Sequence, residues 1–372
     1  MTILALETSC DDTCAAVIDR DGRMLSNVIS SQEAHTRFGG VVPEIASRHH
    51  LKLVNVVVEQ ALTRAGTRLE DVELIAATQG PGLIGALLVG LSTAKALAAA
   101  RQLPFAPIDH LQGHVAANFL TGPEPRRQGQ VGSTPAADAD GSPGAAPDLE
   151  PFEPPFVCLI ASGGHTLLAL VREHDRFETL GSTLDDAAGE AFDKGARLLG
   201  LGYPGGAALE RLAADGDPQA FSFPGSPGER VRGIRARPPR HKRFADSLDF
   251  SFAGVKTALL YTVRELGEEQ ARARAADLAA SYQAAIVEQL RARAERALQH
   301  TGIARLAVGG GVAANGVLRE RLRELPVAIH IPPRALCTDN AAMIASAARF
   351  GEQLPYPSYL ELDAYASGER PR

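Results

Sequence analysis

Two histidines of this chain, His110 and His114, have the residue type and spacing that could bind a metal ion. They follow the apolar segment 105–109, and we expect a helix that begins at about His110. Residues four apart lie on one face of a helix, so both imidazoles could share one ion. A carboxylate from elsewhere would complete a facial set typical of iron or zinc. Asp339, which precedes an expected helix over 341–349, is the best candidate, and a chance pair on a helix surface is the alternative.

Two short stretches have residues that could bind phosphate. An apolar run over 3–6 opens into the polar residues 7–13 and returns over 14–19, and a second run over 156–160 opens into 161–165 and returns over 166–171. Each pattern predicts a β-hairpin with small residues at its tip, where backbone N–H groups can approach phosphate oxygens. Two such hairpins suggest a duplicated domain that closes on a nucleotide from both sides. An ordinary turn is the alternative for either one alone.

A third segment predicts a strand over 306–308, a turn at Gly309, Gly310 and Gly311, and then the start of a helix. Glycines at a helix N-terminus favour a phosphate or a flat ligand close to the backbone. Asn315 would be placed to hydrogen-bond a ribose or a base. A tight strand-to-helix turn without a ligand is an equal alternative.

The composition limits the class of protein. A length of 372 residues with 45% hydrophobic residues allows two packed domains. The net charge of −6 gives no overall positive field, so any nucleic-acid site must be a local patch. The four cysteines lack metal-ribbon spacing and lie in or beside apolar segments, which suits reduced thiols in a cytoplasm. The longest apolar run, over 85–100, is interrupted by polar residues and glycine, so we expect a cytoplasmic protein without a membrane span.

Two segments depart from a globular pattern. Residues 121–155 are rich in proline and glycine and predict a flexible insertion between two lobes. Residues 230–243 carry arginines and lysines and no acidic residue, and they fit either a solvated loop or a contact with a nucleic-acid backbone.

The remaining order is α/β. We expect strands over 74–78 and 105–109 and helices over about 82–101, 184–199 and 279–299. This alternation, with two similar hairpins, favours paired α/β lobes over one parallel sheet. The predicted division is a first lobe over 1–120, completed by about 325–372, the insertion over 121–155, and a second lobe over 156–324.

Nine motifs occur in order along the chain, and together they closely resemble those of the bacterial TsaD family. These are the tRNA N6-adenosine threonylcarbamoyltransferases, once labelled glycoproteases or O-sialoglycoprotein endopeptidases. The motifs cover nearly all of the chain except the insertion and the tail beyond about residue 350, and they include ETSCD at 7–11, SGGHT at 162–166, DDAAGEAFDK at 185–194 and CTDN at 337–340. Two departures are Asp12, where the family usually has glutamate, and the length of the basic segment 230–243.

The resemblance implies an actin-like fold of the sugar kinase and heat-shock ATPase superfamily, built from two duplicated RNase H-like domains with the ligand between them. It implies transfer of a threonylcarbamoyl group from threonylcarbamoyl-AMP to N6 of adenosine 37 in tRNAs that read codons beginning with A, with AMP leaving. It also implies one divalent metal ion per subunit, Fe²⁺ favoured and Zn²⁺ possible, held by His110, His114 and Asp339.

The resemblance also assigns the other site residues. Asp11 is the candidate for orienting the incoming amine or accepting its proton, with a turn-capping role as the alternative. Asp193 would bind the ribose hydroxyls, and Gly206 and Asn315 would bracket the adenosine. The donor and its AMP phosphate would lie on the residues of the second hairpin: Ile160, Ala161, Ser162, Gly163 and Gly164.

The implied partners are tRNA, a paralogous actin-like subunit and a small P-loop ATPase, with no membrane. An apolar strip on the helix over 82–101 is a candidate partner face, and core packing explains it equally well. Three other functions fit less well. A kinase or ATPase of this fold would need no histidine pair, a metallopeptidase would need a base that the intervening residues 111–113 lack, and a non-catalytic scaffold would need no metal ligands.

Overall fold

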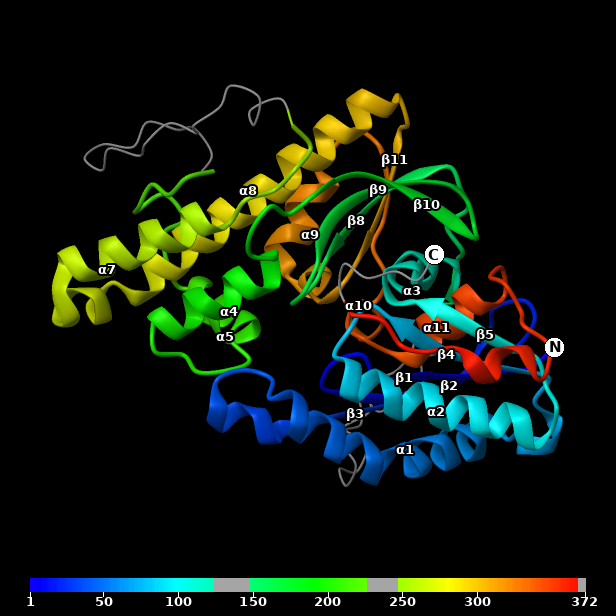
Figure 1. Cartoon of the computed structure of the whole chain (residues 1–372). Coiled ribbons are helices and arrows are strands. Elements are labelled where there is room, and N and C mark those ends of the chain that lie inside the picture. Colours follow the sequence, from blue (N-terminus) through cyan, green and yellow to red (C-terminus); the bar gives the residue numbers. More distant parts are fainter. Residues whose placement is uncertain (124–147, 226–246, 367–372) are drawn as a thin grey trace, which may run out of the picture.

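Two five-stranded sheets with the same strand order form the frame of the molecule (Figure 1). The computed structural model describes residues 1–123, 148–225 and 247–366. The first sheet has the order β3-β2-β1-β4-β5, from the strands β1 Ile3–Glu7, β2 Asp12–Ile18, β3 Met24–Ser31, β4 Leu74–Gly80 and β5 Phe105–Asp109. The second has the order β10-β9-β8-β11-β12, from β8 Phe156–Ala161, β9 Thr166–Glu173, β10 Arg176–Ser182, β11 Arg305–Gly309 and β12 Ala328–His330.

The strands of the two sheets also pair in the same way. In each sheet the first three strands form an antiparallel meander, and the next two join the opposite side in parallel. Both expected hairpins are therefore confirmed, closing at Glu7 opposite Cys14 and at Ala161 opposite Thr166. The repeated connectivity is what a duplicated α/β domain predicts.

Helices cover both faces of each sheet, which gives five layers (Figure 1). The outer face of the first sheet packs against α1 Pro43–Ala65 and α2 Ile84–Ala100. The outer face of the second packs against a larger group, which comprises α4 Ala188–Leu198, α5 Gly206–Ala213, α7 Ala253–Ala273, α8 Ala275–Thr301 and α9 Gly316–Arg323. Between the sheets lie α3 His110–Ala116 and α11 Ala341–Ala348.

Alternating side chains of the central strands explain this layering. In β1, Ile3 and Ala5 belong to the apolar cluster between the sheets, whereas Leu4 and Leu6 belong to the cluster under α1 and α2. The strand β8 alternates in the same way, and all six of its residues are buried. Strands covered on both faces are apolar throughout, which is why these runs contain no polar residue until they end.

Short elements connect the layers. These are the two-stranded ladder of β6 Gly122–Pro123 and β7 Asp148–Leu149, the short helix α10 Arg334–Cys337, and the 3-10 turns η1 Glu33–Phe38, η2 Leu69–Asp71, η3 Ala117–Phe119, η4 Gly311–Ala314 and η5 Ser358–Glu361. Among the described residues, no helix combines the length and apolar character needed to cross a bilayer.

Three boundaries differ from the sequence expectation. The helix expected from residue 184 begins at Ala188, because Asp185 instead accepts hydrogen bonds from Phe252 N at 2.7 Å and Ala253 N at 3.2 Å. The strand β12 pairs with β11 in the second sheet and so lies beyond the expected end of that lobe at residue 324. Both ends of the expected insertion are ordered, since β6 pairs with β7 and the Phe152 ring stacks on His330. Residues 124–147 and the basic segment 230–243 lie outside the described residues.

Candidate metal centre and nucleotide cleft

The first two candidate ligands lie on α3, directly after β5. Asp109 ends β5 and caps the helix, since its Oδ1 accepts hydrogen bonds from Leu111 N at 2.8 Å and Gln112 N at 3.2 Å. The helix starts at His110 as expected, and the ring centroids of His110 and His114 are 4.8 Å apart. Both histidines are buried between the two sheets.

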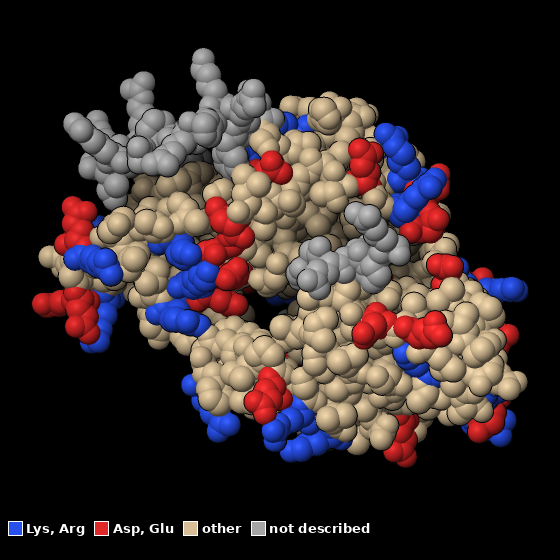
Figure 2. All heavy atoms as spheres, viewed as in Figure 1, with Lys and Arg blue, Asp and Glu red and all other residues tan. Residues whose placement is uncertain are grey.

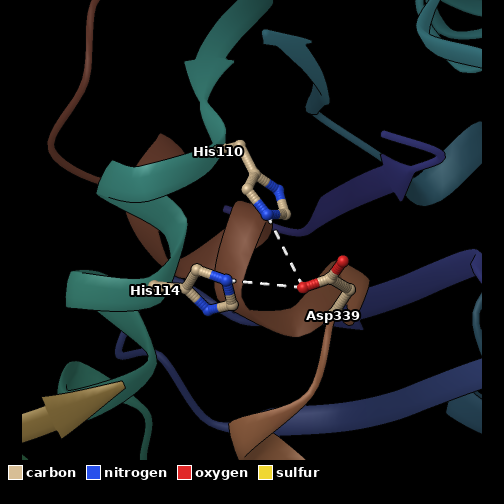
Figure 3. A group of neighbouring side chains, drawn as sticks. All are labelled: His110, His114 and Asp339. Atoms are coloured by element: carbon tan, nitrogen blue, oxygen red, sulfur yellow. Dashed lines mark ion pairs between the residues drawn. The ribbon is translucent and has the colours of Figure 1, made fainter. Parts of the chain in front are cut away.

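The third candidate ligand comes from the turn that precedes α11. Asn340 caps this helix by accepting a hydrogen bond from Met343 N at 3.0 Å, and the cap directs Asp339 toward α3. Figure 3 shows Asp339 Oδ1 facing both rings, 3.5 Å from His110 Nε2 and 3.4 Å from His114 Nε2. The ligand atoms of the three residues all lie within 4.8 Å of one another, so they could hold a metal ion.

Two observations test whether an ion fits here. Both ring nitrogens of His114 are buried; Nδ1 has no hydrogen-bond partner among the described residues, and Nε2 has only the Asp339 oxygen at 3.4 Å, although buried polar atoms are normally satisfied. The two separations from Asp339 Oδ1, 3.5 and 3.4 Å, also suit an ion, because two atoms bonded to one tetrahedral zinc at about 2.1 Å lie about 3.4 Å apart. The residues present therefore fit a divalent metal.

A buried carboxylate, Glu7, lies behind His110 at the end of β1. Its Oε2 lies 3.0 Å from His110 Nδ1 and accepts a hydrogen bond from Thr78 Oγ1 at 2.5 Å, while its other oxygen accepts one from Ser9 N. A proton on Nδ1 that faces Glu7 leaves the lone pair of Nε2 directed at Asp339, which is the tautomer a metal ligand needs. Sequence analysis assigned no role to Glu7. The available signal was an acidic residue at the end of a fully apolar strand.

The charges around His110 favour a cation. Burial by itself lowers the pKa of His110, but Asp339 and Glu7 outweigh it and raise that pKa to about 9. Burial raises the pKa of Asp339, yet the two histidines hold it far below its ordinary value. Two carboxylates on opposite sides of one imidazole thus create a site that a proton or a metal ion would neutralise.

The tip of the second hairpin lies beside this centre and is open. Ser162 N donates to His165 O at 2.8 Å, and His165 N donates to Ser162 Oγ at 3.1 Å, which closes the turn. A Cβ atom at Gly163 or Gly164 would meet no atom within 4 Å, whereas one at Gly189 would lie 2.7 Å from Ser162 O. The start of α4 therefore supports the turn from behind while its other side faces open space.

The rest of the predicted donor site extends from this turn. Ile160 and Ala161 are fully buried in β8, so only their backbone could face a ligand. The imidazole of His165 lies with its centroid 6.4 Å from that of His110, and burial is the main cause that lowers its pKa to about 4. Figure 2 shows a hollow in the surface between the region of α4 and α5 and the start of α1.

Two predicted nucleoside-binding residues also have structural contacts. Asp193 Oδ1 accepts hydrogen bonds from Gly205 N at 2.8 Å and Gly206 N at 3.1 Å, at the start of α5, and burial raises the pKa of Asp193. Asn315 caps α9 by accepting from Leu318 N at 2.9 Å, and its Nδ2 donates to a buried glutamine at 2.8 Å. Each side chain therefore has only part of its polar surface available to a ligand.

Asp11 lies in the turn of the first hairpin. The turn is fixed by His50, whose ring nitrogens lie 3.0 Å from Cys10 O and 2.8 Å from Thr13 Oγ1. The negative charge of Asp11 contributes, after burial, to raising the pKa values of Asp193 and Tyr203 in the second lobe. The charge of Asp11 is thus felt at two residues of the second lobe.

The glycine triplet serves close packing at two of its three positions. A Cβ at Gly309 would lie 2.8 Å from His114 O, and Gly310 has φ +88° with Ala161 O directly against it. At Gly311 the nearest atom to a Cβ is 4.0 Å away, so only this glycine leaves room for a ligand. Gly309 thus allows β11 to pack closely against α3, and Gly310 allows it to pack closely against the end of β8 in the second hairpin.

Comparison with protein families identifies the chain. The model of the family TsaD, tRNA N6-adenosine threonylcarbamoyltransferase, matches residues 23–130 and 144–346. This chain belongs to the TsaD family. The enzyme of that name from Thermomicrobium roseum is 46% identical over 388 residues, covering 98% of this chain and 96% of the relative. That from Pelobacter propionicus is 43% identical over 377 residues, covering 100% of this chain and 98% of the relative. The chain is thus a member of a transferase family that acts on tRNA.

Solved structures with low sequence identity share the fold. Component A of the (R)-2-hydroxyglutaryl-CoA dehydratase of Acidaminococcus fermentans aligns with a TM-score of 0.50 at 14% identity, over 94% of this chain and 97% of that chain. Full-length HypF aligns with a TM-score of 0.52 at 14% identity, over 98% of this chain and 56% of that chain. These neighbours have the actin-like ATPase fold, so the expected fold class is confirmed.

Proposed function

We propose that this chain transfers the threonylcarbamoyl group of threonylcarbamoyl-AMP to N6 of adenosine 37, in tRNAs that read codons beginning with A, and releases AMP. The observation that carries the proposal is the placement of two subsites side by side. The open turn at Ser162–Gly164 offers backbone N–H groups for a phosphate, and the next residue, His165, lies beside His110 of the metal centre. A donor that joins a nucleotide phosphate to an acyl group would span the two.

Each residue then has a chemical task. His110, His114 and Asp339 would hold one divalent ion per subunit, with Fe²⁺ favoured and Zn²⁺ possible from this ligand set. The bound ion would supply Lewis acidity toward the carbonyl that an exocyclic amine, a poor nucleophile, must attack. Backbone N–H groups of Gly163 and Gly164 would bind the AMP phosphate.

The nucleoside contacts come from both lobes. The second carboxylate oxygen of Asp193 would bind the ribose hydroxyls, and Gly206 and Asn315 would bracket the adenosine. Asp11, in the hairpin turn of the first lobe, would orient the incoming amine or accept its proton. Its charge contributes to the raised pKa of Asp193, which supports this role. Ile160 and Ala161 would contribute through their backbone.

The proposed partners follow from the family. We propose a cytoplasmic enzyme that works on tRNA with a paralogous actin-like subunit and a small P-loop ATPase. Two outer helices of the first lobe each expose two large apolar side chains, Leu51 and Val56 on α1 and Ile84 and Leu88 on α2. This surface supports a protein contact at the outer face of the first lobe.

The proposal is tested by a direct product analysis. The purified protein, alone and with the two partner proteins, is incubated with threonylcarbamoyl-AMP and a tRNA that carries A37, and the tRNA is digested to nucleosides for mass spectrometry. The modified adenosine should appear with this tRNA and not with a matched transcript in which position 37 is G. Steady ATP hydrolysis by the isolated chain with no modified nucleoside in any mixture would favour the kinase or ATPase alternative instead.

A further inference from the structure

The C-terminal segment 354–365, here called the C-terminal strap, crosses the first lobe from its edge to the metal-binding helix. It lies beyond residue 346, where the match to the family model ends. At its start Leu354 exchanges two backbone hydrogen bonds with Phe105 at the beginning of β5, with distances of 2.9 and 2.8 Å. The buried ring of Tyr359 then packs against the ring of Phe105, with 5.4 Å between the two ring centroids.

The strap next crosses α2 and reaches the end of β4. Lys95 of α2 donates through Nζ to Leu360 O at 2.9 Å and Leu362 O at 2.7 Å. The side-chain amide of Gln79 in β4 donates to Asp363 O at 2.9 Å. The backbone carbonyl of Gln79 accepts from the backbone N–H of Tyr365 at 3.2 Å. These bonds fix the strap by its backbone up to residue 365.

The strap ends at the residue that caps α3. The hydroxyl of Tyr365 donates to Asp109 Oδ2 at 2.8 Å, while Asp109 Oδ1 accepts from the first amides of α3. A Cβ at Gly80 would lie 2.8 Å from the Tyr365 ring, so the end of β4 has a glycine where this ring approaches. One carboxylate is thus held by the strap on one side and holds the helix of His110 and His114 on the other.

We infer that Tyr365 is a positioning residue for the metal centre, acting through Asp109 on the first turn of α3. The inference rests on the proposed metal site, since it assigns a support to two of the ligands. His110 is the first residue of α3, so the turn that the Asp109 carboxylate caps is the one that carries the His110 imidazole toward Asp339. Supporting residues outside the ligand set orient ligands and tune metal affinity.

The test compares Tyr365→Phe, which removes one hydroxyl, with Tyr356→Phe, which removes a hydroxyl from an exposed tyrosine of the same strap. Zn²⁺ affinity is measured by competition with a chelator. Hydrogen exchange of the amides of residues 111 and 112 is measured on the metal-free proteins. The Tyr365 variant should exchange these amides about 5-fold faster and bind Zn²⁺ up to about 10-fold more weakly, with Tyr356→Phe unchanged in both.

A double-mutant cycle isolates the route through Asp109. In an Asp109→Ala background, Tyr365→Phe should have no further effect on exchange or on Zn²⁺ affinity. Wild-type values for both measurements in Tyr365→Phe, or equal losses in the two tyrosine variants, would overturn the inference. Failure of the wild-type protein to bind either Zn²⁺ or Fe²⁺ would instead overturn the proposed metal centre, while the exchange measurement on metal-free protein still decides whether the strap supports α3.

Discussion

At the scale of single residues, Glu7 is the carboxylate that orients His110 in the candidate metal centre. Its two oxygens accept from Ser9 N on one side and from Thr78 Oγ1 on the other, and His110 Nδ1 lies beside the second oxygen. A glutamine has the same shape, but one of its terminal atoms is an NH₂ donor. In either amide orientation this donor faces another hydrogen-bond donor.

Glu7→Gln should therefore weaken metal binding by about 10- to 100-fold while the protein stays folded. The measurement is chelator competition with Zn²⁺, and circular dichroism reports the fold. Glu178→Gln, at an exposed position of β10, is the matched control and should bind like wild type. Unchanged affinity in Glu7→Gln would mean that the tautomer of His110 is fixed without Glu7.

A substitution at Gly163 tests whether the turn at Ser162–Gly164 binds phosphate. A side chain at this position meets no protein atom within 4 Å, so Gly163→Val should leave stability nearly unchanged while its methyl groups fill the space in front of the turn. We expect a strong loss of AMP affinity by calorimetry. Ser162→Ala loses only the hydroxyl that accepts from His165 N and keeps the backbone amides, so its loss should be smaller. The reverse order would contradict binding of phosphate by these amides.

At the scale of elements, two adjacent aspartates between β10 and α4 join α4 to α7. Asp185 holds the start of α7, and Asp186 pairs with Lys194 of α4 at 2.7 Å and Lys256 of α7 at 2.6 Å. Burial raises the pKa of Asp186, but the two lysines outweigh it and lower that pKa overall. These contacts hold α4, which supports the phosphate turn, against α7.

The lowered pKa fixes how stability depends on pH. A carboxyl whose pKa is lower in the folded protein contributes stability above its unfolded pKa of about 4, and loses it as the pH falls through the folded value. Asp186→Asn should therefore cost about 1 kcal/mol at pH 7, and this cost should shrink below about pH 4. Urea unfolding at both pH values measures it, with the exposed Asp175→Asn as control. A cost that is constant with pH would exclude the ion pairs as its source.

The elements that sequence predicted best are those whose signal is local. The two hairpins and the start of α3 follow from apolar runs, small turn residues and a histidine spacing. Each of these signals involves only residues that are close together in the sequence. The start of α4 was misplaced because Asp185, inside an apparently helical pattern, binds amides 67 and 68 residues away. The role of Glu7 and the C-terminal strap were missed for the same reason. Glu7 bonds Thr78, which is 71 residues away, and Tyr365 of the strap bonds Asp109, which is 256 residues away.

At the scale of the whole molecule, the candidate metal ligands lie in the middle layer. The helix α3 follows the first sheet, while Asp339 belongs to the segment that returns from the second sheet and leads into α11. On the face shown in Figure 2, acidic and basic side chains of the described residues are interspersed. An ion bound by these three residues would therefore join segments that enter the centre from both lobes.

Metal binding should thus stabilise the entire protein. A ligand present at 100 times its dissociation constant stabilises the folded state by about 2.7 kcal/mol, which for a chain of this size corresponds to a rise in Tm of about 3.5 °C. Zn²⁺ should produce this rise in the wild type and none in the variant with both His110→Ala and His114→Ala. The readout is the shift on adding metal, so a lower starting Tm of the variant does not affect it. His174→Ala, at a half-buried histidine paired with Glu153 away from the centre, should keep the full shift, and an equal shift in the double variant would show that the ion binds elsewhere.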